Sequence, residues 1–148
     1  MDFLGDDQCR TLRERLRSWT RQNPLSVEPG PETLEREASR LARQLGQDGF
    51  MAYAVPGQYG GMRETVQARD LCVIREELAS ASALADVMFG VQALGSYPIV
   101  SAGTEEQKKK YLPTLASAES LAAFALTEPE AGSDASATSY RRRRKRRW

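Results

Sequence analysis

Helical periodicity runs through the first 118 residues of the chain and limits the folds open to it. Residues 7–22 show it most clearly, because their apolar side chains recur at intervals of three and four positions, on one face of a helix. These side chains are Cys9, Leu12, Leu16 and Trp19. Similar patterns in the segments 31–47, 64–80, 82–101 and 104–118 predict five helices joined by short connections, an antiparallel bundle.

Prolines and glycines separate the helical segments. Residues 23–31 form a linker with several helix breakers. Residues 50–61 predict an irregular turn, since Val55 precedes a proline and Gly60-Gly61 permits a sharp reversal. Pro113 is expected to limit the fifth helix or to end its first part.

The fourth and fifth segments carry more specific signals. Residues 82–101 are apolar on several sides, a pattern typical of a central helix in a bundle. The apolar side chains are Leu84, Val87, Met88, Phe89, Val91 and Leu94. Core packing explains them best, and lining an acyl-chain pocket is the alternative. Thr104-Glu105-Glu106-Gln107 predicts a capping box at the start of the fifth helix.

The pattern changes after residue 120. Residues 121–126 form an apolar run that predicts a short buried strand. Small, polar and conformationally permissive residues follow, with Pro129 fixing φ and Gly132 able to adopt positive φ. Thr127, Ser133 and successive N–H groups suit a polar ligand such as a pyrophosphate. From composition alone, a plain connector explains the same residues equally well.

The composition excludes several classes of catalytic and metal-binding site. The chain has no histidine, which excludes Ser-His and Cys-His nucleophilic catalysis and His-ligated zinc from what it does alone. Cys9 and Cys72 are too few for a metal cluster, so we expect free thiols in a reducing cytoplasm and no metal. No signal-peptide pattern is present, and no apolar stretch approaches the roughly 20 residues that span a bilayer, so we expect no membrane partner.

Charge is unevenly distributed. Residues 141–147 hold seven of the 21 Lys and Arg residues, and the remainder, 14 basic against 20 acidic residues, is mildly acidic. The arginines of residues 7–22 are predicted to lie on a solvated helix face, in preference to a nucleic-acid site, because no aromatic residues alternate with them. The outer face of residues 64–80 is expected to carry the charged side chains Arg75, Glu76 and Glu77.

Three segments resemble the acyl-CoA dehydrogenase family. Residues 125–137, Ala-Leu-Thr-Glu-Pro-Glu-Ala-Gly-Ser-Asp-Ala-Ser-Ala, are similar to the family signature at every defined position. Residues 98–113, with Pro98-Ile99 and Gly103-Thr104-Glu105-Glu106-Gln107, and residues 55–61, Val-Pro-Gly-Gln-Tyr-Gly-Gly, precede it in the family's order and spacing. The resemblance covers roughly residues 30 to 140.

The resemblance implies a cofactor, a substrate class and site residues. Family enzymes oxidise an acyl thioester, with a carboxylate removing the α-proton and a hydride passing to N5 of FAD. By this resemblance Phe124, Leu126, Thr127, Gly132 and Ser133 bind FAD. Gly90 and Leu94 lie along the acyl chain, with Gly90 at its deep end, and Ser133 also lies near the substrate.

The resemblance also implies partners and domains. The partners are an acyl-CoA or acyl carrier protein thioester, an electron-transferring flavoprotein and further copies of the enzyme. The expected domains are a helical domain at 1–118, the start of a middle β-domain with the flavin-binding loop at 119–140, and an aberrant polybasic tail at 141–148. The family's catalytic glutamate belongs to a C-terminal helical domain, so we expect no catalytic residue here and an inactive fragment.

The polybasic tail and the reaction each have competing interpretations. The tail is interpreted first as a frameshift or truncated gene model, second as an engineered or natural truncation, and third as a functional polybasic tail. Acyl-CoA oxidases, nitroalkane oxidases and flavin monooxygenases share the N-terminal architecture of the family. A non-enzymatic helical module with a nucleic-acid-binding tail is the remaining alternative, and the acidic body and single terminal aromatic residue speak against it.

Overall fold

The structure, a computed structural model, describes residues 6–23, 30–129 and 131–138. The predicted polybasic tail, residues 141–148, lies outside these ranges. The described residues form the α-helices α1 (Asp7–Gln22), α2 (Pro31–Gln47), α3 (Ala68–Ala81), α4 (Ala83–Ala102) and α5 (Glu105–Ala116), and the 3-10 helices η1 (Met51–Ala54), η2 (Gly57–Tyr59) and η3 (Ala135–Ala137). The predicted helical fold is therefore confirmed.

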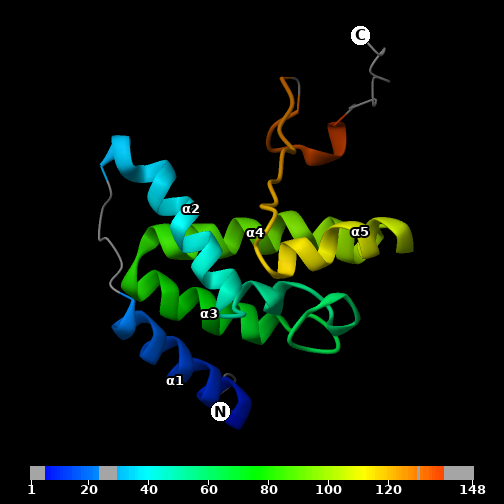
Figure 1. The fold of residues 1–148 in the computed structure, drawn as a ribbon. Coiled ribbons are helices and arrows are strands. Elements are labelled where there is room, and N and C mark those ends of the chain that lie inside the picture. The colour runs from blue at the N-terminus through cyan, green and yellow to red at the C-terminus, as the bar shows by residue number, and fades with distance from the viewer. Residues whose placement is uncertain (1–5, 24–29, 130, 139–148) are drawn as a thin grey trace.

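Helix α4 holds the bundle together. It packs against α2, α3 and α5, while α1 packs against α3. The helices α3, α4 and α5 follow one another in alternating directions, and the chain after α5 leaves the bundle (Figure 1). The predicted antiparallel arrangement is thus seen in these three helices.

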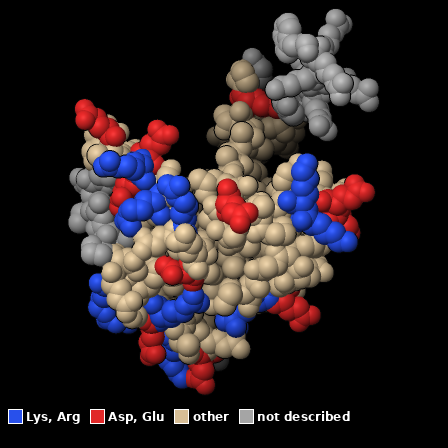
Figure 2. Space-filling view, viewed as in Figure 1, with Lys and Arg blue, Asp and Glu red and all other residues tan. Residues whose placement is uncertain are grey.

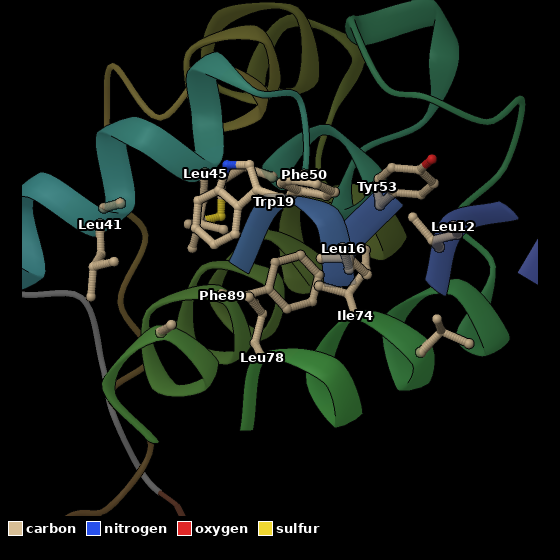
Figure 3. Packing of buried hydrophobic residues seen from close by; sticks show 14 of the residues in the cluster. Leu12, Leu16, Trp19, Leu41, Leu45, Phe50, Tyr53, Ile74, Leu78 and Phe89 are labelled. Atoms are coloured by element: carbon tan, nitrogen blue, oxygen red, sulfur yellow. The ribbon is translucent and has the colours of Figure 1, made fainter. Parts of the chain in front are cut away.

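The core forms where the apolar faces of the helices meet. The predicted face of α1 is buried, and its Leu16 is fully enclosed. Figure 3 shows this leucine among Phe50, Ile74, Leu78 and Phe89, which come from the entry to η1, from α3 and from α4. The rings of Trp19 and Phe50 meet edge to face, with centroids 5.5 Å apart. Burial of such side chains is the main stabilising contribution in a domain of this size.

The irregular turn over residues 50–61 is a compact loop attached to α5. Gly60 has φ 94°, in the left-handed region that favours glycine. The N–H of Gly61 donates to Pro56 O at 3.1 Å. The Tyr59 hydroxyl donates to Glu105 Oε2 at 2.7 Å, which lowers the pKa of that carboxyl. This bond connects the loop to the first turn of α5.

The start of α5 is as predicted, and its end is not. Thr104 Oγ1 accepts from the N–H of Gln107 at 3.3 Å, and Gln107 Oε1 accepts from the N–H of Thr104 at 2.9 Å, completing the capping box. Pro113 lies inside the helix and does not end it. The last turn stays helical because its apolar side chains are buried against the bundle; these are Leu112, Leu115 and Ala116.

Helix α4 is central in the bundle, as predicted, but one of its apolar sides is exposed. Phe89 is fully buried, but Val87, Val91, Leu94 and Tyr97 are 50%, 40%, 52% and 63% exposed. These four positions, which we call the α4 apolar row, recur at intervals of three and four residues along the helix.

The apolar character of α4 also corrects a second expectation. With 20 residues, α4 is long and apolar enough to cross a membrane, judged by length and composition alone. This is weak support for a membrane span, since a core helix of a water-soluble protein passes the same test. Within the described residues, α4 contacts α2, α3 and α5.

The arginines of α1 are exposed as predicted, except Arg13, which is partly buried. Arg13 pairs with Glu77 and Glu76, at 2.5 Å and 2.8 Å, and Arg17 pairs with Glu77 at 2.9 Å. The prediction that Glu77 lies on the outside of its helix is wrong, because this residue is only 7% exposed. These contacts hold α1 to α3 and raise the pKa of Arg13. Basic and acidic side chains also lie side by side on the face shown in Figure 2.

Candidate functional site

The segment that follows α5 is extended and exposed, so the predicted buried strand at residues 121–126 is wrong. These six residues, all within the described part of the chain, form no strand. Leu121, Phe124 and Leu126 are 52%, 44% and 46% exposed. A strand needs a neighbouring backbone to pair with its N–H and C=O groups, and the residues that the structure describes do not supply one here.

A tight turn follows, closed by two backbone hydrogen bonds. The N–H of Glu128 donates to Ala131 O at 2.9 Å, and the N–H of Ala131 donates to Glu128 O at 3.2 Å. Pro129 lies within the turn, where its fixed φ is favourable. Ala131 is 3% exposed. The predicted tight loop at this place is therefore present.

Polar groups follow the turn. Thr127, Gly132 and Ser133 are exposed, and a Cβ added at Gly132 would meet no atom within 4 Å. Asp134 is engaged within the segment, because its carboxylate accepts from the N–H of Ser136 at 3.1 Å and from the Ser136 hydroxyl. These hydrogen bonds lower the pKa of Asp134.

Two residues of α4 hold the beginning of the extended segment. Gln92 Oε1 accepts from the N–H of Ala122 at 2.7 Å. Gly95 allows close approach, since a Cβ there would lie 2.6 Å from Ala122 Cβ and 3.0 Å from the N of Ala123. The segment with the expected FAD-binding residues is thus fixed against the helix with the expected substrate-binding residues.

The two expected substrate-binding residues of α4 differ in their surroundings. Leu94 is 52% exposed and belongs to the α4 apolar row. Gly90 is covered by Arg75, because a Cβ there would lie 3.2 Å from Arg75 Nε. Arg75 makes two 2.7 Å hydrogen bonds to Asp86. The surface at Gly90 is therefore bordered by an ion pair.

The chemistry of the exposed segment fits the edge of a flavin and a phosphate. Exposed hydroxyls at Thr127 and Ser133 and the open space at Gly132 suit polar ring atoms and an anion, and the exposed side chains of Phe124 and Leu126 suit a flat apolar surface.

Within the described ranges, no group of three or more metal-ligating side chains occurs. Both cysteines are free, and burial raises the pKa of Cys9.

Sequence reasoning missed Gln92 and Gly95. A lone carboxamide in an apolar helix, with a glycine three positions later, was the available signal. A surface hollow of about 340 Å³, which was also not predicted, lies between α1 and the irregular loop. Its lining residues are Asp7, Gln8, Thr11, Leu12, Arg15, Tyr53 and Arg63.

Comparison with known proteins agrees with this arrangement. Residues 6–119 match the family described as "Acyl-CoA dehydrogenase, N-terminal domain". An acyl-CoA dehydrogenase of Bacillus subtilis is 38% identical over 128 residues, which cover 84% of this chain and 32% of the relative. A glutaryl-CoA dehydrogenase of Desulfococcus multivorans is 32% identical over 144 residues, covering 94% and 36%.

Solved structures give the same result. An acyl-CoA dehydrogenase from Bacillus anthracis, complexed with FAD, superimposes with a TM-score of 0.74 at 35% identity, covering 90% of this chain and 23% of that one. A glutaryl-CoA dehydrogenase in complex with glutaryl-CoA gives 0.70 at 29% identity, covering 94% and 36%. This chain therefore spans about a quarter to a third of the length of these relatives. It belongs to the acyl-CoA dehydrogenase family.

Proposed function

We propose that this chain forms the N-terminal helical part of an FAD-dependent acyl-CoA dehydrogenase, which oxidises an acyl thioester between its α and β carbons. The observation that carries this proposal is the junction at Ala122. There the chain is held against Gln92 and Gly95 of α4, the helix that carries Leu94, and it then exposes Phe124, Leu126 and Thr127. A cofactor segment and an apolar surface for a substrate are thereby brought together.

Each residue of the exposed segment would contact the part of FAD that suits its side chain or backbone. The backbone of Leu126 and the backbone and hydroxyl of Thr127 would hold the flavin ring edge, with Phe124 against the ring. Gly132 and Ser133 would approach the pyrophosphate, and Ser133 also the substrate. FAD, when bound, supplies the hydride acceptor. None of these protein groups titrates near neutral pH, so they would hold the cofactor without competing for the substrate proton.

The substrate would lie along α4. The α4 apolar row, with Leu94, offers a surface for an acyl chain, and Gly90 would mark its far end. Glu128 and Asp134 are not proposed as the base, and Asp134 already accepts two hydrogen bonds from Ser136. By family membership the base belongs to a C-terminal helical domain, so we propose that these 148 residues do not turn over alone.

The partners follow from the same family membership. We propose an acyl-CoA or an acyl carrier protein thioester as substrate, an electron-transferring flavoprotein as acceptor, assembly into a homo-oligomer and a cytoplasmic location. Helical domain 1–118 and a β-domain starting at 119 remain the proposed division of the chain.

A flavin titration tests the cofactor part of this proposal. We expect the 148-residue chain to quench FAD fluorescence weakly, at high protein concentration, because it supplies only part of a flavin site. Thr127→Val should reduce this quenching, whereas Thr11→Val, on the exposed face of α1, should not. Equal quenching by both variants and the unchanged chain would place the flavin elsewhere.

Adding octanoyl-CoA to the same mixture tests the inactivity. We expect no bleaching of the flavin absorbance, since the base is proposed to belong to a C-terminal helical domain. Rapid bleaching would show that the chain contains a complete catalytic site and would contradict that part of the proposal.

A further inference from the structure

Gln92 is an unusual residue for its position. It lies in the middle of α4, between the apolar side chains Val91 and Leu94, yet it is only 2% exposed. A buried carboxamide destabilises a protein unless its donors and acceptor are paired. Here they are paired, and the partners explain why a polar side chain occupies this position.

The Gln92 side chain binds three backbone groups of one stretch, residues 115–122. Nε2 donates to Leu115 O at 2.9 Å and to Ser120 O at 3.0 Å. Oε1 accepts from the N–H of Ala122 at 2.7 Å. One side chain therefore holds the last turn of α5, the turn that follows and the first residues of the extended segment.

The stretch that Gln92 holds is a sharp reversal of the chain. Ala118 has φ 57°, in the left-handed region that non-glycine residues rarely adopt. The N–H groups of Ala118 and Ser120 donate back to Leu115 O and Thr114 O, at 3.3 Å and 3.1 Å. The bond from Ala122 to Gln92 comes next along the chain and precedes the exposed residues 123–127.

We propose that Gln92 is a positioning residue that sets where the cofactor-binding segment lies relative to the substrate-binding face of α4. This inference rests on the proposed function, because it concerns Leu126 and Thr127 on one side and Leu94 on the other. Leu94 is two residues from Gln92, and Thr127 is five residues from Ala122. The hydrogen bond from Ala122 to Gln92 connects these two sets directly, beside the close contact of Ala122 with Gly95.

Amide hydrogen exchange of the 148-residue chain, followed by NMR, tests the tether without flavin or substrate. Gln92→Met keeps a side chain of similar length and removes all three hydrogen bonds. We expect the Ala122 amide to exchange at least about tenfold faster, because a buried hydrogen bond of this kind is lost. The amides of Ile74 and Leu78, in the core, should change far less.

Ser96→Ala is the matched control. Ser96 is also a buried polar residue of α4, but its hydroxyl donates to Gln92 O within the helix, at 2.7 Å, and does not reach the segment. We expect this variant to leave the exchange of Ala122 unchanged. Equal acceleration of Ala122 and the core amides in Gln92→Met, or no acceleration of Ala122, would overturn the proposal.

A second variant covers the case in which Gln92→Met does not fold. Gln92→Glu keeps an acceptor for the N–H of Ala122, and its carboxyl should hold a proton at pH 5 because it lies between two carbonyl oxygens. We expect Ala122 to keep its protection in this variant. Exchange of Ala122 at the rate of an unfolded amide, with the core intact, would also overturn the proposal.

A distance measurement tests the positioning itself. Spin labels at Leu94→Cys and Thr127→Cys, in a Cys72→Ser background, should give a narrow distance distribution that broadens in Gln92→Met and not in Ser96→Ala. A distribution of equal width in all three proteins would contradict the inference. Because none of these measurements uses FAD, a failure of the proposed function in the flavin titration remains a separate result.

Discussion

At the scale of single residues, the junction between α2 and the reversal after α5 tolerates no added atom. Gly46 is buried on α2, and a Cβ there would lie 2.5 Å from Ala118 Cβ and closer still to Ser117 O. We expect Gly46→Ala to lower the free energy of unfolding by about 1–3 kcal/mol, measured by urea denaturation, because the overlap outweighs the gain in helix propensity.

Gly132→Ala is the control for this substitution. It also adds one methyl group, but at a place where nothing lies within 4 Å, so its unfolding free energy should stay within about 0.5 kcal/mol of the unchanged chain. If Gly46→Ala is as stable as this control, the close packing of α2 against residues 117–118 is wrong.

At the scale of elements, a buried carboxylate holds α1 to α3. Glu77 is 7% exposed and accepts from both Arg13 and Arg17, whereas the Glu76 side chain is 58% exposed and accepts from Arg13. We expect Glu77→Ala to destabilise the chain by about 1–3 kcal/mol, because it removes the buried acceptor that Arg13 and Arg17 share and so breaks two contacts between α1 and α3. Glu76→Ala should lower the free energy of unfolding by less than about 1 kcal/mol, because ion pairs between exposed side chains contribute little to stability. Similar midpoints for both variants in urea denaturation would contradict this assignment.

The elements also show which parts of the structure the sequence can predict. Periodicity predicted α1 and α2 to the residue and the other helices to within a few residues, because each buries its own apolar face. The predicted strand at residues 121–126 is wrong, because strand formation depends on a neighbouring backbone. Periodicity placed α4 correctly but did not show that its apolar row is exposed. The inward position of Glu77 depends on two arginines of another helix, which a pattern along α3 does not contain.

For the candidate site, the sequence predicted a tight loop but did not predict how the preceding residues are held against α4. The small and polar residues around Pro129 indicated a tight loop, and its closing hydrogen bonds are present. The role of Gln92 depends on three backbone groups that lie 23 to 30 residues further along the chain. The residues that bind FAD and substrate remain a prediction drawn from family membership.

At the scale of the whole molecule, the α4 apolar row exposes several large apolar side chains on one helix. Four large apolar side chains recur on one helix whose single ionised residue, Asp86, is paired with Arg75. Contiguous apolar surface of this kind promotes association in water.

We expect the 148-residue chain to self-associate as its concentration rises, in sedimentation velocity experiments. The double variant Val91→Lys/Leu94→Lys should remain monomeric over the same range, with an unfolding free energy within about 1 kcal/mol of the unchanged chain, because both positions are already exposed.

The control for this last experiment separates the apolar row from net charge. Leu34→Lys/Met62→Lys adds the same two charges at positions that are 45% and 48% exposed and lie on α2 and on the loop before α3. We expect this variant to self-associate like the unchanged chain, because isolated apolar side chains contribute little to association. If it becomes monomeric as well, repulsion between more highly charged chains is sufficient and the α4 apolar row is not the contact. If only the α4 variant becomes monomeric, the α4 apolar row is the contact between associated chains. The surface that is proposed to bind an acyl chain is then also the surface through which the chain self-associates in water.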